Sequence, residues 1–162
     1  QVGAPAQVTL VIALREPDDL VRAFSADISR TPAPEAKLPL TRLFAFQAPP
    51  REGVSSQLTS LLDVPEWSGL LAITTTEDDH NVFHGNTLWF IPDSQLSQET
   101  PITPQQVWVF EPAMKAEGLC LLPRNAAAPP GALMLALIYD NDAKKTHMPS
   151  RLQTINLYRT EQ

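Results

Sequence analysis

Short apolar runs, separated by prolines, are the feature that most restricts how this chain can fold. Sixteen of its 162 residues are proline. Proline has no N–H to donate to a helix or sheet ladder, so each one favours a loop or the end of an element. The runs between the prolines are rich in β-branched and aromatic residues, which is typical of short β-strands.

Eight segments have this strand signature, and several of them alternate between apolar and more polar residues. In 7–14, for example, Val8, Leu10 and Ile12 share one face of an extended chain. Such alternation indicates one buried and one solvated face, as in antiparallel sheets. The predicted strands are 7–14, 39–47, 69–76, 86–92, 106–111, 118–123, 131–140 and 151–159.

Two segments, 17–28 and 54–63, have a helical period instead. Each carries apolar residues at spacings of three and four, which would share one face of an α-helix. Pro17 and the two aspartates after it suit a helix N-terminus, and Pro65 would end the second helix. The stripes are Leu20, Val21, Phe24 and Ile28 in the first segment, and Val54, Leu58, Leu61 and Leu62 in the second. We therefore predict a mainly β fold: a single domain over 1–162, an antiparallel β-sandwich of about eight short strands with helical insertions at 17–28 and 54–63.

The charge and hydropathy of the chain argue against two classes of protein. The net charge is −6, whereas nucleic-acid binding requires clustered Lys and Arg. The longest apolar runs, such as 132–139, are far shorter than the roughly 20 residues of a membrane-spanning helix. The chain begins with Gln1 rather than Met, which fits the removal of a signal sequence or lipid-anchor segment. We therefore expect membrane attachment only through an N-terminal lipid anchor upstream of Gln1.

One segment, 77–86, concentrates groups that bind metals: three carboxylates and two of the chain's three histidines, His80 and His84. On a strand these histidines would lie roughly 13 Å apart, too far for one ion. One helical turn would bring them within about 6 Å of each other. A third ligand would still have to come from elsewhere, and His147 and Asp140 qualify only by elimination. Because the segment lies between two predicted strands, we predict a solvated hairpin or bulged loop rather than a metal site.

Other motifs that carry chemistry are incomplete or absent from the sequence. Asp140 and Asp142 have the spacing of a calcium loop, but the glycine and glutamate that complete such a loop do not follow. No serine lies in a G-x-S-x-G turn, and the six glycines form no phosphate-binding loop. Cys120 stands in the apolar run GLCLLP, which predicts a buried, unreactive thiol. The three tryptophans are assigned to the core: Trp67, Trp89 and Trp108. We expect no catalytic residues, no bound metal and no cofactor.

The first connection, residues 15–37, is the most unusual loop of the predicted fold. It is much longer than the usual connection of about 4–6 residues, and the prolines in SRTPAPEAK prevent regular strand pairing. Connections of this length usually have a function. We therefore predict that this loop contacts a protein partner, and we assign the contact to Asp18, Asp19 and Arg22.

The order of the elements is informative in itself. It runs through an opening strand (QVTLVIAL), the 15–37 loop, a proline-preceded strand (LPLTRLFAFQ) and a helical stretch (VSSQLTSLLD), and later through PPGALMLALIYDND and RLQTINLYR. This layout resembles the small outer-membrane lipoprotein of bacterial type VI secretion systems. The chain departs from that family where EPDD replaces an Asn-Pro pair, and where a C-terminal Arg preceded by Trp is missing, with Arg151 as a candidate counterpart.

The resemblance implies a transthyretin-like sandwich in the periplasm, anchored to the outer membrane by a lipidated N-terminal cysteine. It also implies that the first loop docks onto the periplasmic part of an inner-membrane secretion component. The sequence thus predicts a non-enzymatic, extracytoplasmic protein-binding component of a bacterial envelope assembly. One alternative is an immunity or inhibitor-type protein that blocks a toxin or enzyme through its acidic surface, in which case binding should be salt-sensitive. A second alternative is a metal-dependent enzyme built around His80 and His84.

Overall fold

β-strands make up most of the part of the chain that the structure describes. The computed structural model describes residues 9–14, 20–27, 41–96, 101–111, 114–123, 131–140 and 150–159. In chain order the elements are β1 (Thr9–Leu14), β2 (Leu20–Asp27), β3 (Thr41–Gln47), β4 (Ser56–Val64), η1 (Pro65–Trp67), β5 (Gly69–Glu77), β6 (Phe83–Pro92), η2 (Asp93–Gln95), β7 (Gln105–Val109), β8 (Ala116–Leu121), β9 (Leu133–Tyr139) and β10 (Arg151–Leu157). The two η elements are short 3-10 helices, and no helix in these ranges is long and apolar enough to cross a membrane. The predicted mainly β fold is confirmed, and each predicted strand overlaps an observed one.

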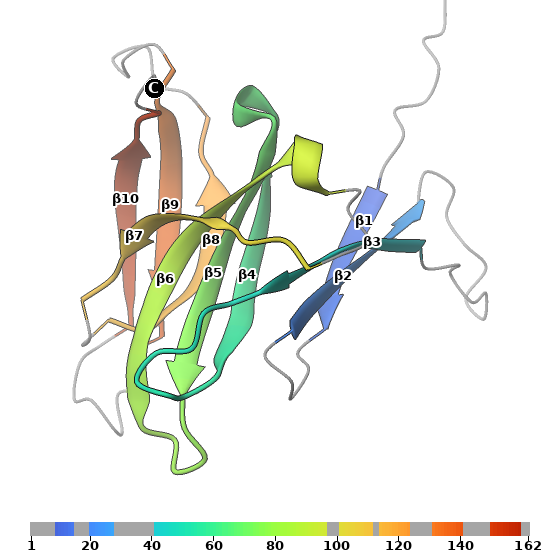
Figure 1. Cartoon of the computed structure of the whole chain (residues 1–162). Helices are drawn as coiled ribbons and strands as arrows, with labels where there is room; N and C mark the ends of the chain where they lie inside the picture. Colours follow the sequence, from blue (N-terminus) through green and yellow to red (C-terminus); the bar gives the residue numbers. More distant parts are fainter. Residues whose placement is uncertain are drawn as a thin grey trace, which may run out of the picture.

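The strands form three antiparallel sheets that follow one another across the molecule (Figure 1). The central sheet has the order β4-β5-β6-β7, one flanking sheet β1-β2-β3, and the other β10-β9-β8. Side chains of β5 and β6 pack against those of β8 and β9 in one core, and against those of β2 and β3 in a second core. The sandwich that we predicted therefore has a further sheet on the other face of its central sheet.

Strand β5 shows how one strand serves both cores. Leu71 and Ile73 belong to the core shared with β9, while Leu70 and Ala72 belong to the core shared with β3. Because successive side chains of a strand point to opposite faces, a strand covered on both faces needs apolar or small residues at every position. This requirement accounts for the continuous run GLLAITTT, in which every residue is buried.

The two predicted helices are wrong, because 17–28 and 54–63 overlap the strands β2 and β4. The pairing of β4 with β5 shifts register between Leu58 and Ser60, which inserts one extra residue into β4. Leu58 and Leu61 therefore face the same core, although three positions separate them. Leu62 faces the other core. A bulged strand buried on both faces thus reproduces the spacings of three and four that we took for a helix. The pairing of β2 with β3 also shifts register, but there the extra residue, Leu43, lies in β3.

The first connection also differs from the prediction. Strand β2 lies inside it and pairs with both β1 and β3, so residues 15–37 do not form one long loop. The parts of this connection on either side of β2, residues 15–19 and 28–37, lie outside the described residues.

Candidate functional site

The residues predicted to contact a partner are only partly placed by the structure. Asp18 and Asp19 lie outside the described residues, whereas Arg22 lies on β2 with a partly exposed side chain. The next residue, Ala23, is fully buried in the core shared with the central sheet. Because side chains alternate along a strand, Arg22 lies on the opposite face of its sheet. A contact at these three residues stays a prediction, but the helix on which we placed them is absent from 20–27.

His80 and His84 stand at a β-hairpin, as the default interpretation of the sequence predicted. β5 ends at Glu77 and β6 begins at Phe83. Between them the Asp78 carboxylate accepts hydrogen bonds from the backbone N–H groups of His80 (2.9 Å) and Val82 (2.8 Å). These two bonds lower the pKa of Asp78, the one from Val82 most strongly. The helical turn that would bring the two histidines together does not form.

The His84 side chain is held between two carboxylates. Its Nδ1 lies 3.0 Å from Glu52 Oε2, and its Nε2 lies 3.3 Å from Asp78 Oδ2. The hydrogen bonds to Glu52 and then to Asp78 raise the pKa of His84, which favours the imidazolium form that donates from both nitrogens. An imidazolium has no lone pair for a metal. Within the described ranges there is also no cluster of three His, Cys, Asp or Glu side chains that could hold an ion.

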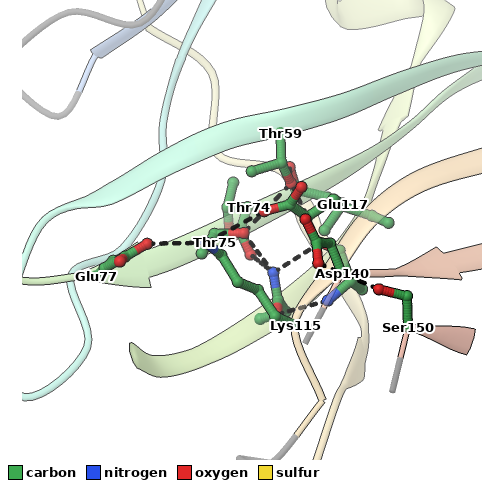
Figure 2. A network of polar contacts seen from close by, with 11 residues as sticks. Thr59, Thr74, Thr75, Glu77, Lys115, Glu117, Asp140 and Ser150 are labelled. Atoms are coloured by element: carbon green, nitrogen blue, oxygen red, sulfur yellow. Dashed lines mark hydrogen bonds and ion pairs between the residues drawn. The ribbon is translucent and has the colours of Figure 1, made fainter. Parts of the chain in front are cut away.

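A buried polar network joins the central sheet to the β10-β9-β8 sheet (Figure 2). At its centre the Asn86 amide on β6 binds both backbone groups of Ala116, because Oδ1 accepts from the Ala116 N–H (3.0 Å) and Nδ2 donates to the Ala116 carbonyl (3.0 Å). The same Nδ2 donates to the Thr74 carbonyl (3.2 Å) and to the Thr75 hydroxyl. Thr59, the residue inserted by the β4 bulge, accepts a hydrogen bond from Thr75 (3.3 Å). Each polar group of the Asn86 side chain is thus satisfied inside the protein.

Lys115 extends this network toward the surface and is also held by ion pairs. Its Nζ lies 3.1 Å from Glu77 Oε2 and 3.2 Å from Glu117 Oε1 (Figure 2). Partial burial lowers the pKa of Lys115, but the bonds and attraction from the two glutamates outweigh this effect and raise it above its usual value. A lysine that stays protonated is not a nucleophile. Nearby, Asp140 donates from its backbone N–H to the Lys115 carbonyl (3.1 Å) and accepts from the Ser150 hydroxyl (3.2 Å).

The strand registers assign no charged side chain to the outer face of the β10-β9-β8 sheet; Glu117, the extra residue of the β8 bulge, is not assigned to a face by them. Leu133, Leu135, Leu137 and Tyr139 point into the core, so the alternate residues of β9 point outward, and the strand registers assign their neighbours to the same face. This outer face consists of Gly118, Cys120, Met134, Ala136, Ile138, Leu152, Thr154 and Asn156. Leu152 is 73% exposed and Ile138 is 51% exposed. Cys120 is exposed as well, so the prediction of a buried thiol is wrong.

The spacing of the apolar residues in β10 indicates which of them points to this outer face. Leu152 is out of phase with Ile155 and Leu157, which pack against the core. In a strand without a bulge, a residue an odd number of positions away must point to the opposite face. The register of β10 with β9 runs without a shift, so Leu152 necessarily points outward.

Strand β7 forms a second exposed apolar segment, at the edge of the central sheet. Its residues Val107, Trp108 and Val109 are between 38% and 40% exposed. The Trp108 ring stacks on Phe110, with ring centroids 5.1 Å apart, and the residue remains 38% exposed. The core assignment is confirmed for Trp67 and Trp89 and wrong for Trp108.

Comparisons with protein-family models, with curated proteins and with solved structures each found no match. The resemblance to the type VI lipoprotein family therefore rests on the layout of the sequence. The role of the chain has to be inferred from its own surfaces, and the two surfaces that stand out are the β7 edge and the outer face with its edge strand β10.

Proposed function

We propose that this chain is a non-enzymatic protein-binding component of a bacterial envelope assembly, which pairs the edge strand β7 with an extended segment of a protein partner. One observation carries the proposal: β7 is a free edge of the described central sheet. Among the described strands it pairs with β6 alone, and all five of its residues are exposed. An edge strand offers unpaired N–H and C=O groups, to which a partner segment can add as a further strand.

The composition of β7 supports this mode of binding. Natural proteins usually protect sheet edges with charged residues, proline or bulges. The five residues QQVWV contain neither a charge nor a proline. The pairing with β6 leaves Val107 as an extra, bulged residue, so a partner segment would pair with the parts of β7 on either side of it. Trp108 offers the large apolar surface that is typical of residues contributing most to protein interfaces. The other edge of the central sheet, β4, lies beside β8 instead, where the Leu119 N–H donates to the Ser60 hydroxyl (3.2 Å).

The chemistry of the polar clusters also favours binding over catalysis. His84 is held between two carboxylates, Lys115 is kept protonated by two glutamates, and Asn86 binds the backbone of a neighbouring strand. Each of these groups stabilises the fold through the contacts it makes. The envelope setting, the periplasmic location and a secretion-component partner come from the resemblance and belong to the proposal, as does a second contact at Asp18, Asp19 and Arg22.

A quantitative pull-down from the solubilised envelope of the source bacterium tests the proposal. Val109→Lys places a charge on the free edge of β7, the device by which natural edges resist pairing. We expect it to reduce recovery of the bound partner at least about tenfold, as loss of a central interface contact does. Gln57→Lys adds the same charge at an exposed position of β4 and should leave recovery unchanged.

A third variant separates the two contacts. Replacing Asp18, Asp19 and Arg22 together by alanine tests the contact predicted in the first connection while leaving β7 intact. Equal recovery by the wild type and by Val109→Lys would rule out the β7 edge. Loss confined to the triple variant would move the contact to these three residues. The melting temperatures of the two lysine variants should match that of the wild type, and the melting temperature of the triple variant is measured alongside, so that altered recovery can be separated from unfolding.

A further inference from the structure

We propose that two copies of this chain associate through β10, which pairs antiparallel with β10 of the second copy and joins two three-stranded sheets into one of six strands. The proposal goes beyond partner binding at β7 and concerns a different sheet. Among the described strands β10 pairs with β9 alone, and all of its residues except Ile155 and Leu157 are exposed. Its free edge can therefore accept another strand.

β10 lacks the features that normally prevent edge pairing. Its register with β9 runs through seven residue pairs without a bulge. RLQTINL contains no proline and no glycine, and Arg151 is its only charged residue. The other edge strands of the two stacked sheets differ. β4 and β8 carry bulges and lie beside each other, and β7 carries a bulge at Val107 where it pairs with β6.

The sequence of β10 is compatible with itself in one particular register. A two-fold axis at Thr154, perpendicular to the sheet, pairs all seven residues and gives about one backbone hydrogen bond for each pair. Thr154 then lies opposite Thr154 of the second copy, and Leu152 lies opposite Asn156. On the other face Gln153 lies opposite Ile155, and Arg151 lies opposite Leu157. No charged residue lies opposite a charged residue of the same sign, which is the arrangement that destabilises cross-strand pairs.

The local charge permits a second copy at this strand. Two chains that each carry a net charge of −6 repel one another overall. That repulsion is weakest where acidic residues are absent, and β10 contains none. Arg159, which follows β10, is engaged within its own copy, because its Nη1 donates to the Trp67 carbonyl (3.4 Å) and its guanidinium lies over the Phe90 ring.

Pairing also covers part of the exposed apolar surface. Leu152, the most exposed large apolar side chain among the described residues, would lie beside Asn156 of the second copy and would keep Ile138 as its neighbour in its own sheet. The outer faces of the two copies would become continuous across the two-fold axis. Association thus gives Leu152 a cross-strand neighbour on its exposed side, where a single copy has none among the described strands.

Sedimentation velocity of the full chain tests for this association. Small interfaces bind weakly, so the protein concentration is raised to roughly 200 μM. We expect the wild type to pass from monomer to dimer as its concentration rises. Thr154→Lys and Thr154→Glu each place like charges opposite one another at the axis, and each should raise the Kd about fivefold. An equimolar mixture of the two variants should restore association through a Lys–Glu pair, whereas Gln57→Lys on β4 should change nothing. A wild type that stays monomeric, or a mixture that does not recover, would overturn the proposal.

Cross-linking through an engineered cysteine tests the register. With Cys120→Ser to remove the native thiol, Thr154→Cys places two cysteines directly opposite one another, and we expect a disulfide-linked dimer on mild oxidation. Asn156→Cys in the same background is the matched control, since its two copies would lie roughly 13 Å apart along the strand. The native Cys120 thiols would lie about 24 Å apart, five strand spacings across the joined sheet. Efficient cross-linking through Cys120 or at Asn156→Cys, but not at Thr154→Cys, would show that the outer faces stack instead, and would overturn edge pairing.

Discussion

Strands β5 and β10 have similar residues and very different surroundings. Both are antiparallel strands with leucine, isoleucine and threonine, and both pair without interruption over most of their length. β5 lies in the central sheet and is buried on both faces, from Gly69 to Thr76. β10 lies at an edge, and most of its residues are exposed. The difference shows that strand propensity alone does not decide burial. The number of covered faces decides it, and the same kind of strand is part of the core in one position and an exposed edge in another.

The largest expected effect on stability is that of removing a leucine from β5, and the matching substitution in β10 should have almost none. Leu71→Ala in β5 leaves a cavity in the core shared with β9, and should lower the free energy of unfolding by about 2–5 kcal/mol. Leu152→Ala in β10 removes a side chain that is already in water, and should change it by less than about 0.5 kcal/mol. Urea unfolding of both variants at low protein concentration measures the two values. Equal losses would mean that β10 is covered and that the contrast between the strands is wrong.

A smaller loss is expected where the central sheet is joined to its neighbour. Asn86→Ala leaves the N–H and the carbonyl of Ala116 without their side-chain partners in a buried site, and should cost about 1–3 kcal/mol of unfolding free energy. Thr87→Ala, at the next and partly exposed position of β6, is the matched control and should cost less.

A second substitution at the same position separates hydrogen bonding from packing. Asn86→Asp nearly preserves the volume of the side chain and can still accept from the Ala116 N–H. It cannot donate to the Ala116 carbonyl when ionised, so it should also destabilise the fold. An Asn86→Asp variant as stable as the wild type would show that the donated bonds contribute little.

The sequence predicted the strands well and the placement of the sheets poorly, for physical reasons. Alternation and flanking prolines located eight strands, because both signals are local. β4 was missed because a bulge and two buried faces gave Leu58, Leu61 and Leu62 a helical spacing. The third sheet was missed because which sheet covers which face depends on contacts between residues far apart in the chain.

The candidate surfaces were predicted less completely than the fold. The hairpin at 77–86 was identified correctly, since two strong strand signals flank it. The exposure of Trp108 and Cys120 was not, because both stand in apolar runs that would be buried in an interior strand. An edge position cannot be read from composition, since it is defined by the absence of a neighbouring strand. The phase of Leu152 relative to Ile155 was the one local signal that pointed outward.

The smallest expected effect concerns the rim of the central sheet, where His84 ties the β5–β6 hairpin to the turn at Glu52. The two carboxylates raise the pKa of His84 in the folded state above its ordinary value of 6.5. Its contribution to stability is therefore fully present below pH 6.5 and is lost as the pH rises through the raised pKa. The wild type should exceed His84→Gln in melting temperature at about pH 5.5, and the gap should narrow toward about pH 8.5. Asp78, whose pKa is lowered, titrates below this window and does not affect the comparison. His80→Gln, at the exposed position of the same hairpin, is measured alongside as the control for loss of an imidazole from this hairpin. A gap that stays constant with pH would mean that His84 acts through packing alone, and that this rim is held by the β5–β6 pairing rather than by the ion pairs.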